Sequence, residues 1–327
     1  MRTEDYTFSI PQCDIPPERR AALASYRAKR STWLSWLDND EHHAIWDTIS
    51  AMVWTDVSFR ALTQFAIDDE TSCLGNPLVA EQLINGHVAT QVLAIRRLVD
   101  KRSDVISLRR LVKELRRNFN FFTRENYVCH DGLPYDYEAT QMKEMIARAG
   151  SGAFWGDTTG PNAYGTSQMA HNQFDKLTGI DPTKRSREDR LPVALLNTIE
   201  RWLNDSGADD LAEWSHAYLA HAGDPVNRQR IAALLVTTNK ITQAIKSLAR
   251  VTEAISANLL FAGGRMHSLM PTAQFDQFEN LENPILRADA KDNAYQIWDK
   301  LSDERDEFLD GVDVELIEAV KPDVADT

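Results

Sequence analysis

His216 and His221 are the residues whose type best suits chemistry, because imidazole accepts and releases a proton near neutral pH. In the string AEWSHAYLAHAGDPV, His221 shares the apolar face of a predicted helix with Leu211, Trp214 and Tyr218. A helix C-terminus favours the protonated imidazole, since its unpaired carbonyl groups carry partial negative charge. The position therefore suits a histidine that transfers protons. It is also typical of a packed, hydrogen-bonded core histidine, so both interpretations stay open.

The spacing of these histidines argues against a metal site. Five residues turn a helix through roughly 140° beyond one full turn, so His216 and His221 do not face one ion as an i, i+4 pair does. The cysteines lie far apart without Cys-x-x-Cys spacing, which excludes a thiolate zinc site and a disulfide framework; they are Cys13, Cys73 and Cys129. We therefore predict buried free thiols, no metal ion and no cofactor.

The elements that must position these residues are helices. The chain has 327 residues, of which only 14 are Gly and 12 are Pro, and this scarcity of helix-interrupting residues favours an all-α fold. Ser103 and Asp209 are expected to cap two of the helices. Apolar stripes predict helices at about 17–28, 41–67, 76–99, 138–149, 191–203, 209–221, 228–261 and 289–310, besides the one that Ser103 caps. We predict an elaborated bundle of antiparallel helices.

Three parts are expected along the chain. Residues 1–40 form an N-terminal arm and helix, residues 41–262 form the bundle, and residues 263–327 form a helical extension with an acidic tail. A loop-rich insertion is expected at about 123–190. Within it, the sixteen residues 150–165 hold five of the 14 glycines, at Gly150, Gly152, Gly156, Gly160 and Gly165. No Gly-Lys-Ser/Thr follows them, so this stretch is predicted to be a lid or connector rather than a phosphate-binding loop.

Charge is distributed unevenly. The chain as a whole carries −13, which disfavours nonspecific binding to nucleic acid or an anionic membrane. Between Arg96 and Arg124, however, ten basic residues stand against three acidic ones, and from Asp299 to the C-terminus eleven acidic residues stand against three basic ones. Both segments are also typical of ordinary solvated helix faces. No run of eighteen apolar residues and no signal-peptide core are present, so we expect a cytoplasmic protein without membrane contact.

The string SHAYLAHAGD on a helix resembles the signature of the HEPN superfamily. In that signature an Arg, usually followed by a polar residue, precedes a His by four to six intervening residues. The stretch VLAIRRLVDKRSDVISLRRLVKELRRN is similar to the corresponding helix pair in abortive-infection HEPN proteins of the AbiU type. The strings FTRENYVCHDGLPYD and FDKLTGIDPTKRSREDR also resemble that group, and the similarity covers roughly residues 40–260.

The resemblance implies a HEPN-like helical bundle that forms a homodimer, so that two Arg/His motifs meet in a cleft. In active members the His, assisted by the Arg, promotes attack of an RNA 2′-hydroxyl on the adjacent phosphate, without a metal ion. Such proteins act as toxins, some with an antitoxin partner, or in phage defence. Imidazole supplies the proton transfer, and guanidinium grips the phosphate.

This sequence departs from the signature at the arginine. Among the positions where the Arg would stand are Ser215 and His216, respectively six and five residues before His221. We therefore predict a catalytic set of His221, His216 and Ser215. RNA would be held by the basic helix residues Arg109, Arg110, Lys113, Arg116 and Arg117.

Two alternatives to a metal-independent endoribonuclease remain. One is a catalytically inactive HEPN-like module that binds RNA, a nucleotide or a protein. The other is a plain helical scaffold. Loss of cleavage on mutation of His221 separates the first hypothesis from the second, and salt-dependent RNA affinity separates the second from the third.

Overall fold

The structure is a computed structural model, and its described part consists of two compact units. Residues 6–69, 71–149, 156–220, 234–265, 268–270 and 291–306 are described, together with the single positions 226, 229, 231, 279, 281 and 283. The first unit spans residues 1–70 and 74–271, and the second spans residues 71–73 and 272–327.

The predicted all-α class is confirmed. The helices of the first unit are α1 (Arg20–Leu34), α2 (Ile45–Asp68), α3 (Pro77–Leu98), α4 (Leu108–Arg117), α5 (Arg124–Cys129), α6 (Tyr137–Ala147), α7 (Tyr164–Thr178), α8 (Val193–Asn204), α9 (Ala208–Ser215) and α11 (Thr238–Glu253). The second unit contains α12 (Lys291–Asp306). No strand occurs in the described ranges, where the β-structure is one isolated bridge between Thr123 and Arg190. None of the helices described is long and apolar enough to cross a membrane.

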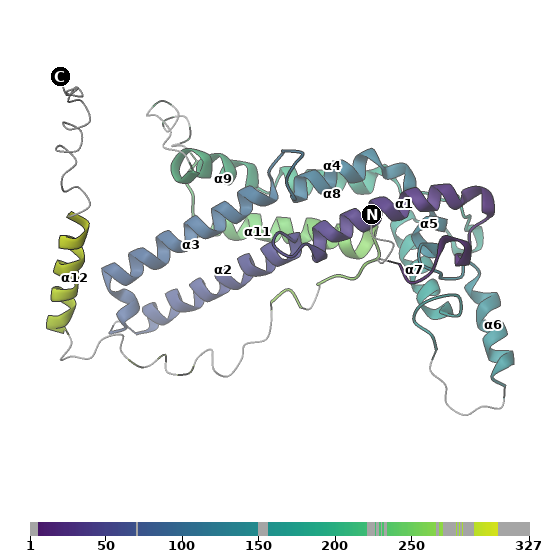
Figure 1. The fold of residues 1–327 in the computed structure, drawn as a ribbon, viewed down its shortest axis with the longest axis horizontal. Coiled ribbons are helices and arrows are strands. Elements are labelled where there is room, and N and C mark those ends of the chain that lie inside the picture. Colours follow the sequence, from purple (N-terminus) through teal and green to yellow (C-terminus); the bar gives the residue numbers. More distant parts are fainter. Residues whose placement is uncertain are drawn as a thin grey trace, which may run out of the picture. The chain divides into compact units, whose positions relative to one another are not determined.

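The long helices α2 and α3 form an antiparallel hairpin, which packs against α9 on the α3 side and against α11 on the α2 side (Figure 1). Their lengths follow from uninterrupted apolar stripes, which place Ile49 and Met52 of α2 and Val92 and Ile95 of α3 in the core. Asn76 starts α3 by accepting a hydrogen bond from the Leu78 N–H (3.0 Å). The predicted helices at 41–67 and 76–99 are thus confirmed.

Two predicted caps are wrong. The N-cap of α4 is Ser107, whose hydroxyl accepts the Arg110 N–H (3.1 Å) and donates to the Asp100 carbonyl (2.7 Å), so Ser103 lies before the helix. The N-cap of α9 is Gly207, whose φ of 72° is left-handed and favours glycine. Both predictions failed because another residue suited to the N-cap stands nearby: Ser107 four positions after Ser103, and Gly207 two positions before Asp209.

The predicted long helix at 228–261 is wrong as one element. Residues 234–237 are not helical, and α11 begins at Thr238, capped by the Thr237 hydroxyl, which accepts the Lys240 N–H (3.2 Å). The end of α11 runs into a wide π-helical turn at Ala254–Leu259. The helical spacing of apolar residues continues through residues 234–237, so the sequence does not indicate that the helix is interrupted there.

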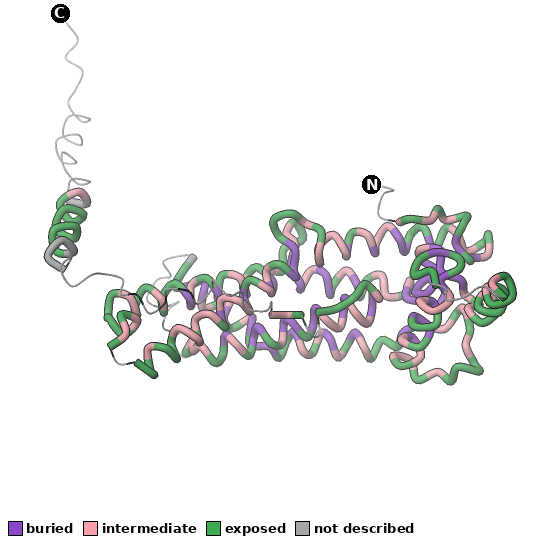
Figure 2. The backbone as a smooth tube through the Cα atoms, turned by 90° about the horizontal axis from the view of Figure 1, so that it is seen from below, coloured by how far each residue is buried: buried purple, intermediate pink, exposed green. Residues whose placement is uncertain are grey.

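The segment at 123–190, expected to be rich in loops, contributes two helices to the core. Every residue of α5 is buried, and α7 buries Ala170, His171 and Phe174. In Figure 2, buried residues are concentrated at the end of the first unit that α5 and α7 occupy, and along the inner sides of the long helices. The short helix predicted at 138–149 is confirmed as α6, whereas α5 and α7 were not predicted.

Candidate functional site

The predicted catalytic stretch lies at the end of α9. Ser215 is the last residue of α9 and is 0% exposed, and its hydroxyl has no hydrogen-bond partner in the described structure. His216 follows as the first residue of a π-helical turn, His216–Ala220, and is exposed. The Trp214 and Tyr218 rings stack at 5.2 Å between centroids. His221 lies outside the described residues.

Ser215 and His216 differ in their exposure to solvent. The side chain at Ser215 is enclosed in the packing of α9, the helix that lies against α3, whereas the side chain at His216 faces solvent. Wide π turns are frequent at functional sites, because the extra residue in the turn redirects the side chains that follow. Of the two positions where the signature places its arginine, His216 is therefore the one open to a substrate.

The basic helix α4 has most of its arginines bound within the chain. Arg109 donates to Asp209 (2.6 Å) and to Asn204 (2.5 Å). Arg116 donates to both carboxylate oxygens of Glu200 (2.5 and 2.6 Å), and these hydrogen bonds raise the pKa of Arg116. The acidic residues of α8 and α9 thus compensate much of the charge that the sequence suggests for RNA.

The remaining cations of α4 differ in exposure. Arg110 lies over the Trp36 ring (4.3 Å) and donates to the Val105 carbonyl (2.8 Å). Arg117 pairs with Glu114 (3.0 Å), and Lys113 is exposed. Binding of RNA by this helix stays a prediction.

Arg124 and His130 fit the signature spacing, although neither is among the predicted site residues. Arg124 is the only arginine in the chain that precedes a histidine by four to six intervening residues. It is 0% exposed, and its guanidinium donates to Asp175 (2.7 Å) and to Asp189 (2.8 Å). These two ion pairs hold the guanidinium inside the protein, away from any phosphate in solution.

His130 is enclosed in a different neighbourhood. Its ring lies edge-on to Tyr6 and Tyr26, at 6.4 Å between centroids in each case, and Arg27 donates to its carbonyl oxygen (2.6 Å). Burial lowers its pKa well below the ordinary value, so His130 is neutral. The spacing match at Arg124 and His130 therefore corresponds to two structural residues.

The same ion-pair network joins the two strings that resemble the AbiU group. Asp175 receives a second arginine, Arg185, whose Nη2 lies 2.5 Å from its carboxylate, and Glu125 pairs with Arg187 (2.8 Å). Burial alone would raise the pKa of Asp175, but the hydrogen bonds from Arg185 and Arg124 outweigh it and lower the pKa. These contacts fasten α5 to α7 and to the 185–190 segment.

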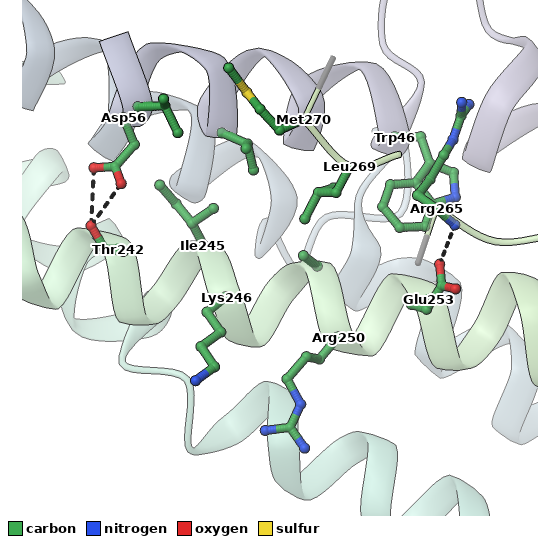
Figure 3. Close-up of a pocket in the computed structure, with 13 residues that line it drawn as sticks. Trp46, Asp56, Thr242, Ile245, Lys246, Arg250, Glu253, Arg265, Leu269 and Met270 are labelled. Atoms are coloured by element: carbon green, nitrogen blue, oxygen red, sulfur yellow. Dashed lines mark hydrogen bonds between the residues drawn. The ribbon is translucent and has the colours of Figure 1, made fainter. Parts of the chain in front are cut away.

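A cavity of about 600 Å³ lies between α2 and α11, and Arg265, Leu269 and Met270 also line it (Figure 3). Its walls are mainly apolar, and they include Trp46, Val53, Val57, Ile245, Leu269 and Met270. No pattern in the sequence indicates this cavity, because each of these residues is typical of an ordinary core.

Polar groups stand at both ends of this cavity. At one end the Asp56 carboxylate accepts the Thr242 hydroxyl (3.0 Å) and the Arg60 Nε–H (3.2 Å), with His87 Nε2 at 3.8 Å. Burial lowers the pKa of His87. At the other end the Glu253 carboxylate accepts the Arg265 backbone N–H (2.7 Å).

Potential metal ligands do not cluster in the part of the chain that the structure describes. Across the described ranges, no group of three or more His, Cys, Asp or Glu side chains is placed to hold a metal ion. Cys13 and Cys129 are buried free thiols, as predicted, whereas Cys73 is exposed.

Comparison with known proteins identifies the family. No curated protein and no solved structure is significantly similar to the chain. The family model HEPN_AbiU2, described as AbiU2, matches residues 72–281, which is more than half of the chain and includes α9, the π turn and α11. The resemblance inferred from the sequence is thereby confirmed, and the chain belongs to the AbiU2 family of HEPN proteins.

Proposed function

We propose that this abortive-infection-type protein cleaves RNA without a metal ion, with His221 as general acid–base and His216 in the place of the usual arginine. The family match supports the defence role. The observation that carries the catalytic assignment is the exposure of His216 next to the buried Ser215.

The chemistry needs one group that moves protons and one that holds the phosphate. His221 accepts the proton of the RNA 2′-hydroxyl, whose oxygen attacks the adjacent phosphorus. The bond from phosphorus to the 5′-oxygen of the next nucleotide breaks, and the protonated His221 returns the proton to that oxygen. The products are a 2′,3′-cyclic phosphate and a 5′-hydroxyl. A protonated His216 is both a cation and a hydrogen-bond donor, so it supplies the two properties that guanidinium gives the phosphate.

The second candidate is a catalytically inactive module that binds RNA, a nucleotide or a protein. The absence of an arginine at both signature positions favours it, because loss of one preorganised donor typically lowers a rate by about 10²-fold. The homodimer, the antitoxin partner and the cytoplasmic location stay predictions.

The test measures cleavage of a single-stranded RNA in EDTA by the full chain and four variants. We expect His216→Ala to lose at least about 10²-fold in rate, and His216→Arg to retain or exceed the wild-type rate, because it restores the signature. Ser215 belongs to the catalytic set predicted from the sequence, but its hydroxyl is buried out of reach of a substrate, so Ser215→Ala is expected to cleave normally. His42→Ala, at an exposed turn before α2, is the matched histidine control.

Folding of each variant is checked by circular dichroism. A His216→Ala protein that is folded and cleaves like wild type would refute the assignment of His216. Absence of cleavage by all five proteins would favour the binding module.

A further inference from the structure

Arg30 of α1 is a buried cation without a carboxylate partner. It is 6% exposed, and its Nη2 donates to the Leu260 carbonyl (3.0 Å). Among the described residues no carboxylate forms an ion pair with it, and its Nε–H has no acceptor, whereas Arg27, three residues earlier, has Asp131 at 3.8 Å. A charge that is buried without a counter-charge strongly destabilises a fold, so Arg30 requires a negative partner.

The side chains around Arg30 do not supply that negative charge. Burial raises the pKa of Tyr26 to about 12, against the opposing effect of the Arg30 charge beside it, so the Tyr26 phenol is protonated. Burial, together with the charge of Arg30, holds the pKa of His130 well below its ordinary value, so its ring is neutral. The carboxylate of Asp131 is the partner of Arg27.

Hydrogen-bond donors on the same face of α1 also lack acceptors. Tyr26, Arg30 and Trp33 follow one another at intervals of four and three residues, which places them on one side of the helix. The Tyr26 hydroxyl and the Trp33 Nε1–H are buried without a partner in the described structure. The Phe122 ring packs against both of these rings, at 5.9 and 5.7 Å between centroids. Buried donors are almost always paired with protein, water or an ion.

We infer that Arg30 and Tyr26 bind a small monovalent anion, such as chloride, which accepts the Arg30 Nε–H and the Tyr26 hydroxyl. A water molecule would satisfy the donors but would leave the charge of Arg30 uncompensated. A divalent anion such as sulfate would replace one buried net charge by the opposite one. The site lies on α1 rather than on α9 or the π turn, and it does not depend on the proposed cleavage of RNA.

The experiment compares thermal unfolding of the full chain in sodium chloride and in sodium gluconate at equal ionic strength. We expect chloride to raise the melting temperature in a saturable way beyond the effect of the larger gluconate ion. Tyr26→Phe keeps the ring and removes one donor, so it is expected to weaken chloride binding at least about tenfold. Tyr295→Phe, on the exposed surface of α12, is the matched control and is expected to respond like wild type.

Arg30→Met is expected to fold in gluconate, because it removes the uncompensated charge, and to lose the response to chloride. In crystals grown with sodium bromide, the anomalous signal of bromide is expected beside the Arg30 guanidinium and the Tyr26 hydroxyl. The proposal is overturned if chloride and gluconate act equally on wild type, if Tyr26→Phe responds as Tyr295→Phe does, or if bromide does not occupy this position. Should Arg30→Met not fold, Tyr26→Phe and the bromide position decide.

Discussion

Replacing Arg124 by Met tests whether this arginine is a structural residue or the arginine of the RNA-cleaving signature. The guanidinium is fully buried and forms ion pairs with Asp175 and Asp189 at 2.7 and 2.8 Å. Asp175 retains Arg185 in the variant, whereas Asp189 loses the one arginine that it pairs with in the described structure. Removal of one partner of a buried ion pair costs about 3–5 kcal/mol, because the other charge stays buried and uncompensated.

The assay is urea unfolding followed by circular dichroism, and the matched control is Arg116→Met. Arg116 also pairs with a carboxylate, Glu200, but both side chains are about one third exposed or more, so the control should lose no more than about 1 kcal/mol. We expect Arg124→Met to lower the free energy of unfolding by about 3–5 kcal/mol. A loss below about 1 kcal/mol, together with loss of RNA cleavage in the folded variant, would refute the structural role.

Three further predictions concern packing, pH and the signature. Gly160→Ala should destabilise the protein by about 1–3 kcal/mol, because its φ is +81° and a Cβ would stand 2.3 Å from the Phe8 ring; an unchanged urea midpoint would contradict this. Burial lowers the pKa of His171 to about 4, whereas the ordinary value is near 6.5, so the unfolded chain binds a proton at higher pH than the folded protein. The stability is therefore complete above pH 6.5, and about 3 kcal/mol of the free energy of unfolding is lost as the pH falls to 4. His171→Gln should flatten this pH dependence, and an unchanged slope would argue against the assignment. Ser215→Arg should lower the melting temperature, because a long charged side chain cannot be enclosed there without a partner, whereas His216→Arg should not; equal melting temperatures would show that position 215 is open.

The sequence predicted those helices whose apolar stripe and cap agree. For α2 and α3, long runs of apolar residues at helical spacing coincide with tertiary burial, and Asn76 and Pro77 mark the start of α3 clearly. The break at residues 234–237 was missed because the stripe is not interrupted there, so spacing alone could not reveal that Thr237 begins a new helix.

Features that depend on contacts between distant segments were not predictable. Arg124 meets Asp175 and Asp189, which are 51 and 65 positions further along the chain, and nothing in the local composition indicates that these charges become buried together. The cavity likewise requires α2 and α11 to lie side by side. At the candidate site, the sequence indicated the positions 215 and 216, and only the packing of α9 distinguishes the buried one from the exposed one.

The most direct test of the proposed function is the chemistry of the RNA ends that the wild-type protein and His221→Ala produce in EDTA. The account predicts 2′,3′-cyclic phosphate and 5′-hydroxyl ends from wild type and no cleavage by the folded variant. Equal cleavage by the two proteins, or no cleavage by wild type, would contradict it.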